Sequence, residues 1–126
     1  LGEDFALRHP HNILLADENK TSRNICVRIL GKLGYNVTAV KDANSVLHEL
    51  KKYSYDIVVL DIHLSGLDAM SATITIRNRW PDVPSLRIYG MSDLSYQEDV
   101  YQCLAVGMDG FLSKPFQMKQ LRKLLE

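Results

Sequence analysis

Three acidic residues and one lysine each follow a short apolar run: Asp17, Glu18, Asp61 and Lys114. Such runs are typical of buried strands, and parallel strands bring their carboxyl ends to one edge of a sheet, where ligands bind in open α/β folds. Clustered carboxylates repel one another and raise each other's pKa values unless a cation joins them. Mg²⁺ suits that position because it takes oxygen ligands and keeps several waters. These residues therefore predict carboxylate chemistry around a divalent metal ion.

The apolar runs belong to an alternation of strands and helices. We predict strands at 13–16, 35–40, 56–60, 88–91 and 110–113. Between them, apolar residues recur at helical spacing. The first helix is predicted to stop at Gly34, the second to begin after an N-cap at Asp42, and the third to end before Pro81. A capping box at Ser95–Glu98 opens the fourth helix, and the fifth begins at Gln117.

Five strand–helix units with short connections predict a parallel sheet covered by helices on both faces. Right-handed crossovers limit the topologies, and we predict an α/β, flavodoxin-like, doubly wound sheet of five strands in the order 2-1-3-4-5. In that order the first and third strands are neighbours, so Asp17, Glu18 and Asp61 are expected to converge. We predict that residues 1–11 are a linker and that residues 12–126 form one domain.

Composition excludes several classes of protein. The 126 residues are 46% hydrophobic and 24% charged, which is typical of one globular domain. The net charge is zero, so no overall field favours nucleic acid or an anionic membrane. No apolar run approaches the roughly 20 residues of a membrane helix. Cys26 and Cys103 each fall on the apolar face of a predicted helix. We therefore interpret them as buried free thiols of a protein in a reducing compartment. We expect a cytoplasmic domain that contacts neither nucleic acid nor membrane, cut from a longer protein that is a candidate for membrane anchoring.

The motifs in this order resemble the receiver domain of two-component response regulators. The resemblance rests on Asp17-Glu18-Asn19 after the first strand, Asp61 after the third, and Lys114-Pro115-Phe116 after the fifth. The stretch from Cys103 to Phe111 and the entry segment Arg8-His9-Pro10 are similar to receivers attached to hybrid histidine kinases. The resemblance covers about residues 12–126, and its strength lies in the order and spacing of motifs that are weak one by one.

The resemblance implies a role for each chemical group. Asp61 matches the phosphoacceptor, and a carboxylate is a competent nucleophile for forming an aspartyl phosphate. Asp17 and Glu18 match the acid pair that holds Mg²⁺ directly or through water, and His63 matches a position that lends its backbone carbonyl to the metal. Lys114 matches the lysine that pairs with the bound phosphoryl group. Positioning and electrostatics do most of the work in such a transfer.

A conformational switch is also implied. Ser92 matches the switch hydroxyl at the end of the fourth strand, and Phe111 matches the aromatic residue that changes rotamer with it. A plain turn serine and a core phenylalanine remain the alternatives. Pro84 permits another register that places Tyr89 and Gly90 at the switch position, but Ser92 keeps the strand continuous. In the family the Lys-Pro peptide bond is cis.

Four residues depart from the usual pattern of the family. Glu18 stands where aspartate is usual, Ser65 replaces a frequent proline, and Ala69 replaces a frequent glycine. Asp93 follows Ser92 where a small residue usually leaves room for the phosphoryl group. We expect Asp93 to modulate the reaction, because its carboxylate would repel phosphate.

These residues support a phosphoacceptor receiver whose partner is a histidine kinase or a histidine phosphotransfer domain, with homodimerisation as a further candidate. The isolated domain would catalyse its own phosphoryl transfer, and whether the parent chain is a hybrid histidine kinase stays open. One alternative is a degenerate receiver that docks partners with weak or no phosphorylation, favoured by Asp93 and Glu18. A haloacid dehalogenase-type phosphatase would need a second acid at position 63, and a flavodoxin would need a phosphate-cradling loop in place of Asp17-Glu18-Asn19.

Overall fold

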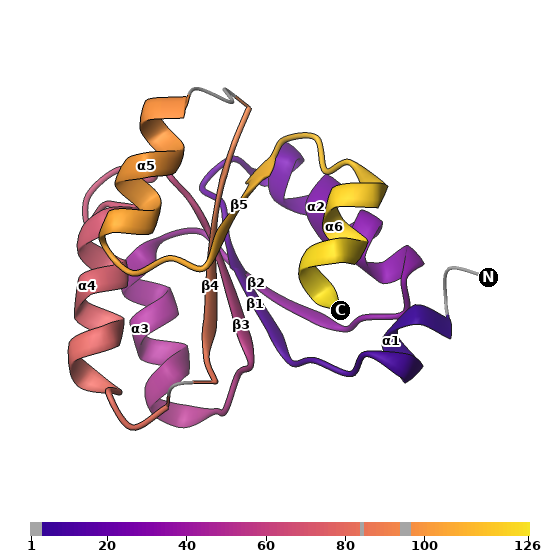
Figure 1. Ribbon diagram of the computed structural model, residues 1–126, viewed down its shortest axis with the longest axis horizontal. Helices are drawn as coiled ribbons and strands as arrows, with labels where there is room; N and C mark the ends of the chain where they lie inside the picture. Colours follow the sequence, from indigo (N-terminus) through magenta and orange to yellow (C-terminus); the bar gives the residue numbers. More distant parts are fainter. Residues whose placement is uncertain (1–3, 84, 94–96) are drawn as a thin grey trace.

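One parallel sheet forms the centre of the molecule (Figure 1). The computed structural model describes residues 4–83, 85–93 and 97–126. Its strands lie in the order β2-β1-β3-β4-β5, which confirms the predicted flavodoxin-like topology. Their bounds are β1 Ile13–Ala16, β2 Val37–Val40, β3 Ile57–Asp61, β4 Arg87–Ser92 and β5 Gly110–Ser113.

Helices cover both faces of the sheet. Helices α1, α2 and α6 lie on one face, and α3, α4 and α5 lie on the other (Figure 1). Their bounds are α1 Phe5–Arg8, α2 Lys20–Lys32, α3 Ala43–Lys52, α4 Ala69–Arg79, α5 Gln97–Ala105 and α6 Met118–Leu125. Each helix in the described residues is too short or too polar to span a bilayer.

Local sequence signals set several helix ends. The side chains of Asn19, Asp42 and Asp68 each accept a hydrogen bond from the backbone N–H three residues on, which satisfies a donor that the first helical turn leaves unpaired. Gly34 and Gly107 follow α2 and α5 with φ of 98° and 108°, a conformation that costs glycine little. The predicted capping box at Ser95–Glu98 lies outside the described residues.

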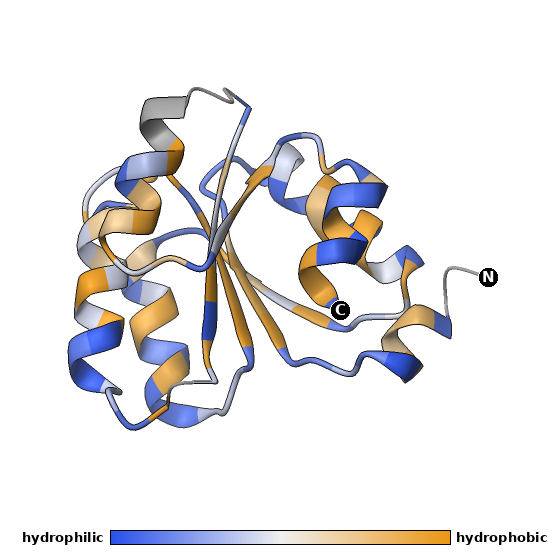
Figure 2. Cartoon of the chain, viewed as in Figure 1, coloured by the Kyte–Doolittle hydropathy of each residue, from blue (hydrophilic) through white to orange (hydrophobic). Residues whose placement is uncertain are grey.

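The strands carry the core because their side chains alternate between two apolar layers. Leu15 and Val59 face the α2 and α6 side, whereas Leu14 and Val58 face the α3 and α4 side. Figure 2 shows the hydrophobic strands at the centre of the fold and hydrophilic segments on the outer helices. Because every residue of β1 and β3 is buried, these two strands provide a rigid base for whatever follows their carboxyl ends.

The segment that we predicted as a linker contains structure. Helix α1 places Phe5 in the core, 4% exposed, with its ring centroid 6.4 Å from that of Tyr35. The Tyr35 hydroxyl donates to the backbone carbonyl of His9. The segment therefore packs against the domain from Phe5 onward. A helix of four residues is too short to show a periodic pattern in the sequence, which is why it was not predicted.

Candidate functional site

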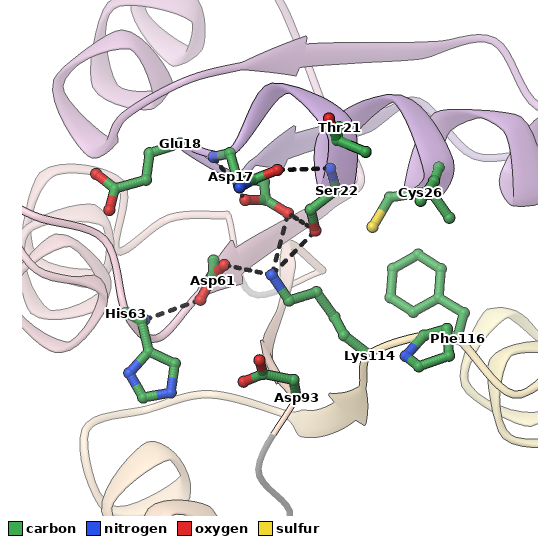
Figure 3. Close-up of a pocket in the computed structure, with 13 residues that line it drawn as sticks. Asp17, Glu18, Thr21, Ser22, Cys26, Asp61, His63, Asp93, Lys114 and Phe116 are labelled. Atoms are coloured by element: carbon green, nitrogen blue, oxygen red, sulfur yellow. Dashed lines mark hydrogen bonds and ion pairs between the residues drawn. The ribbon is translucent and has the colours of Figure 1, made fainter.

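A pocket lies at the carboxyl edge of the sheet, where β1, β3 and β5 end (Figure 3). Asp17 follows β1, Asp61 is the last residue of β3, and Lys114 follows β5. The pairing of β1 with β3 places Ala16 beside Leu60, so the two following acids lie at one edge. The residues that line the pocket include Asp17, Glu18, Ser22, Cys26, Asp61, His63, Asp93, Lys114 and Phe116.

Lys114 joins the two buried acids. Its Nζ donates to Asp61 Oδ2 at 2.7 Å, to Asp17 Oδ2 at 3.1 Å and to Ser22 Oγ at 3.1 Å. Burial by itself would lower the pKa of Lys114, but the hydrogen bonds and charges of Asp61 and Asp17 outweigh it, so the pKa is raised. Lys114 is therefore a protonated counter-ion for both carboxylates at neutral pH.

Asp17 is held by the turn that starts α2. Its Oδ1 accepts from the backbone N–H of Asn19 at 3.0 Å, and its Oδ2 accepts from the Ser22 hydroxyl. Arg23 donates to its backbone carbonyl at 2.8 Å. Sequence reasoning missed Ser22 as a site residue. The signal was present, because a serine three residues after the N-cap Asn19 lies in the first helical turn beside Asp17.

Asp61 and His63 are linked through the backbone. The His63 N–H donates to Asp61 Oδ1 at 2.9 Å, which fixes one carboxylate oxygen while Lys114 binds the other. The His63 ring lies beside the site, as expected, with Nε2 3.0 Å from the hydroxyl of Ser92. Ser92 is fully buried. The histidine thus connects the acidic cluster to the residue predicted as the switch.

The third acid does not join the other two. Glu18 is exposed and its Oε2 accepts hydrogen bonds from Ser65, at 2.6 Å from Oγ and 3.4 Å from the backbone N. Figure 3 shows its carboxylate pointing away from Asp17 and Asp61. Among the described residues, no three His, Cys, Asp or Glu side chains are arranged to hold a metal ion. All three carboxylates line one pocket, but that of Glu18 turns outward because its longer side chain reaches a hydroxyl donor in the neighbouring loop, so its role as a metal ligand stays a prediction.

The fourth strand has the register that we preferred. β4 ends at Ser92, which pairs with Ser113, whereas Gly90 lies in mid-strand opposite Leu60. A Cβ at Gly90 would lie 3.0 Å from Met108 Sδ, so this glycine allows α5 and its following loop to pack closely. Ser92 is therefore the residue at the carboxyl end of the strand.

The other predicted residues surround the pocket. Asp93 is exposed and lines its rim, and Phe111 is half-buried against the core on the α5 side. The Lys114-Pro115 peptide bond is cis, as the resemblance implied. Burial, and then the charge of Asp17, raises the pKa of Cys26 to about 11, so this thiol beside the pocket is protonated and a poor nucleophile.

Comparison with known proteins identifies the family. A family model described as the response regulator receiver domain matches residues 13–126, and the chain belongs to that family. It is thus a receiver domain of two-component signalling.

Similar curated proteins include hybrid signal transduction histidine kinase K of Dictyostelium discoideum, 32% identical over 120 residues. Transcription factor SKN7 of Saccharomyces cerevisiae is 33% identical over 119 residues. These matches cover 90% and 94% of this chain but 10% and 19% of the relatives, so the chain spans a small part of their length.

A solved structure from Pseudomonas aeruginosa PAO1 resembles the chain closely. It is the receiver domain of a sensor histidine kinase, described with a magnesium ion coordinated in its active-site cleft. It aligns with a TM-score of 0.78 and 31% identity over 91% of this chain and 93% of that one.

Proposed function

We propose that this domain accepts a phosphoryl group on Asp61 from the phosphohistidine of a histidine kinase or a histidine phosphotransfer domain. One observation carries the proposal: a buried carboxylate at the end of β3 lines a pocket and is bound at 2.7 Å by a protonated lysine that follows β5. A lysine whose pKa is shifted by specific carboxylate partners in a pocket marks a candidate functional site.

The chemistry follows from the two oxygens of Asp61. A carboxylate oxygen attacks phosphorus, the bond between phosphorus and the donor histidine nitrogen breaks, and its electron pair leaves with the imidazole. The His63 N–H holds one oxygen in place. Lys114 already contacts the other oxygen, so its ammonium lies where the phosphoryl charge arrives and can pair with it. Ser22 links Lys114 to Asp17, because its hydroxyl accepts from Lys114 Nζ and donates to Asp17 Oδ2.

The donor set fits Mg²⁺, the ion that the family and the Pseudomonas relative suggest. The oxygens available are the carboxylates of Asp17 and Asp61, the backbone carbonyl of His63, and the exposed carboxylate of Glu18, which a rotamer change can redirect. Such hard oxygen ligands match magnesium chemistry. When bound, Mg²⁺ would offset the negative charge that builds up between the carboxylates and the phosphoryl group.

Signalling would follow from a shift between two conformations. Ser92 would turn its hydroxyl from His63 toward the phosphoryl oxygen, and Phe111 would change rotamer on the neighbouring strand. The direct contact between Ser92 Oγ and the His63 ring supports this assignment, because it gives the hydroxyl a defined resting partner. Asp93 on the rim would slow the reaction by repelling phosphate.

The chain covers a small part of its relatives, so its wider setting is part of the proposal. We infer a cytoplasmic domain of a longer signalling protein, such as a hybrid histidine kinase. Its partners would be the phosphohistidine donor and, as a further candidate, a second copy of this domain in a homodimer. Because the net charge of the domain is zero, we expect it to contact neither nucleic acid nor membrane.

A degenerate docking domain is the second candidate, favoured by the hydrogen bonds that turn Glu18 toward Ser65. Intact-mass spectrometry after incubation with acetyl phosphate separates the two. A phosphoacceptor gains one phosphoryl group only with Mg²⁺, and Asp61→Asn gains none. No addition to the wild type with Mg²⁺ in excess would overturn the phosphoacceptor function and leave the docking domain.

A further inference from the structure

The loop between β3 and α4 contacts an acid of the opposite loop. We propose that Ser65 is a positioning residue that holds Glu18 away from Asp17 and Asp61, so that a divalent metal ion binds only after the Glu18–Ser65 contact breaks. The inference rests on the proposed function, because it assigns Glu18 to the metal site of a phosphoacceptor.

Two donors of one residue meet one oxygen of Glu18. The Ser65 hydroxyl lies 2.6 Å from Glu18 Oε2 and the Ser65 backbone N lies 3.4 Å from it. A hydrogen bond to an ionised oxygen at the shorter distance is of the strong, charge-assisted kind. Glu18 also borders a second groove, which Lys41, Ser65 and Gly66 line with it. The side chain thus has a defined resting place outside the cluster that Lys114 joins.

Electrostatics favours the same arrangement before metal binds. Lys114 Nζ binds both Asp17 and Asp61, so the inner cluster contains two negative charges and one positive charge. Moving the carboxylate of Glu18 inward adds a third negative charge, which costs free energy until a cation arrives. Ser65 adds to that cost, because its hydrogen bonds must be exchanged for water or metal. Only molecules in which Glu18 has left Ser65 are ready to bind metal. The apparent metal affinity is therefore lower the more populated the Glu18–Ser65 contact is.

The residue types at both positions suit this role. A serine offers an N–H and a hydroxyl at position 65, whereas a proline there would offer neither. The extra methylene of glutamate, relative to aspartate, lengthens the reach from β1 to the loop. Two departures from the usual receiver pattern are therefore partners in one contact.

Isothermal titration with Mg²⁺, without any phosphodonor, tests the proposal. We expect Ser65→Ala to bind Mg²⁺ about three- to tenfold more tightly than the wild type, the change expected for loss of one exposed, charge-assisted hydrogen bond. Ser65→Thr keeps the hydroxyl and should bind as the wild type does. Ser54→Ala is the matched control, because Ser54 is an exposed serine between α3 and β3, away from the site.

The carboxyl ¹³C signal of Glu18 should shift with Mg²⁺ in the wild type, and Ser65→Ala should shift it part of the way without metal.

A double-mutant cycle shows whether Ser65 acts through Glu18. In the Glu18→Ala background, which leaves Ser65 no acceptor at position 18, Ser65→Ala should leave the Mg²⁺ affinity unchanged. An equal gain in that background would overturn the inference, because Ser65 would then act through the loop alone.

Failure of the inference differs from failure of the proposed function. If the wild type binds Mg²⁺ and accepts phosphoryl from acetyl phosphate but Ser65→Ala binds no more tightly, Ser65 does not position Glu18. If no variant binds Mg²⁺ or accepts phosphoryl, the phosphoacceptor function is overturned and this inference with it.

Discussion

The two edges of the sheet use positive charge in opposite ways. At the carboxyl edge, Lys114 forms ion pairs with two buried carboxylates, those of Asp17 and Asp61. At the amino edge, Arg77 donates mainly to backbone carbonyls, and Arg87 donates to the carbonyl of Leu124 and contacts the Tyr89 hydroxyl and the His11 ring, all of which are uncharged acceptors when His11 is neutral. The ammonium and the carboxylates can exchange partners when a cation or a phosphoryl group arrives at the carboxyl edge. The carbonyls at the amino edge would keep the partners that they have.

The amino-edge contacts join elements that are distant in the sequence. Arg77 on α4 donates to the carbonyl of Leu86 at 2.7 Å and to that of Gly107 at 3.0 Å and 3.1 Å. Arg87 on β4 donates to the carbonyl of Leu124 at 2.9 Å, and the Tyr89 hydroxyl donates to the same carbonyl at 2.8 Å. These arginine contacts pair backbone carbonyls at the ends of helices and loops that would otherwise lack a hydrogen-bond donor. We therefore expect loss of the contacts to affect the stability of the fold more than its phosphorylation.

The largest expected effect is at the carboxyl edge. Asp61→Asn should abolish phosphorylation, because the amide cannot act as the nucleophile, and should leave the fold intact, because Asn can still accept from the His63 N–H and Lys114 keeps Asp17 as a partner. Asp56→Asn, an exposed position at the amino end of β3, is the matched control and should accept phosphoryl normally. Labelling of Asp61→Asn at the wild-type rate would contradict the assignment.

The reverse result is expected at the amino edge. Arg77→Met keeps the apolar stem but removes the donors to Leu86 and Gly107, and should lower the free energy of unfolding by about 2 kcal/mol. The ion pair with the half-exposed Asp109 adds little. Urea unfolding measures the loss, and Arg79→Met on the exposed side of α4 should change it by less than about 0.5 kcal/mol. A slower phosphorylation of the folded Arg77 variant would break the contrast between the edges.

A smaller effect is expected at the rim of the pocket. Asp93→Ala should speed phosphorylation by acetyl phosphate about two- to threefold, the effect of one solvated charge on an approaching anion. The gain should shrink at high salt because the interaction is screened. Asp82→Ala removes an exposed acid at the amino edge and should leave the rate unchanged. An unchanged or slower rate for the Asp93 variant would show that this carboxylate does not repel the donor.

The smallest effect concerns alkaline pH. The pKa of Lys114 is raised above its ordinary 10.5 in the folded state, so its contribution to stability is complete below the unfolded pKa and is lost as the pH rises through the folded pKa. The difference in unfolding free energy between the wild type and Lys114→Met should therefore be constant at neutral pH and shrink above 10.5. A difference that stays constant through that range would mean that Lys114 is not held as a charged group.

Sequence patterns predicted the strands better than the side-chain contacts. β1 and β5 have the predicted bounds, and the Asp42 cap forms as expected, because apolar runs and capping residues act over a few positions. The placement of Asp17, Asp61 and Lys114 at one edge then follows from the strand order.

What could not be predicted depends on long-range packing or on rotamers. Glu18 could turn inward or outward from the same backbone, and its choice depends on Ser65, which is 47 residues away. The contacts of Arg77 depend on how α4 meets the loop after α5, 30 residues further on. No local pattern encodes either contact, whereas Ser22 could have been found from its place in the first turn of α2.

The contact between His63 and Ser92 also provides a spectroscopic handle. The ¹⁵N chemical shift of an imidazole nitrogen differs between a nitrogen that carries a proton and one that accepts a hydrogen bond. Because His63 Nε2 lies 3.0 Å from the Ser92 hydroxyl, a rotation of that hydroxyl toward the pocket would change the environment of one assignable nitrogen. The resonance of a single native side chain would then give the populations of the two states in solution, without any attached label.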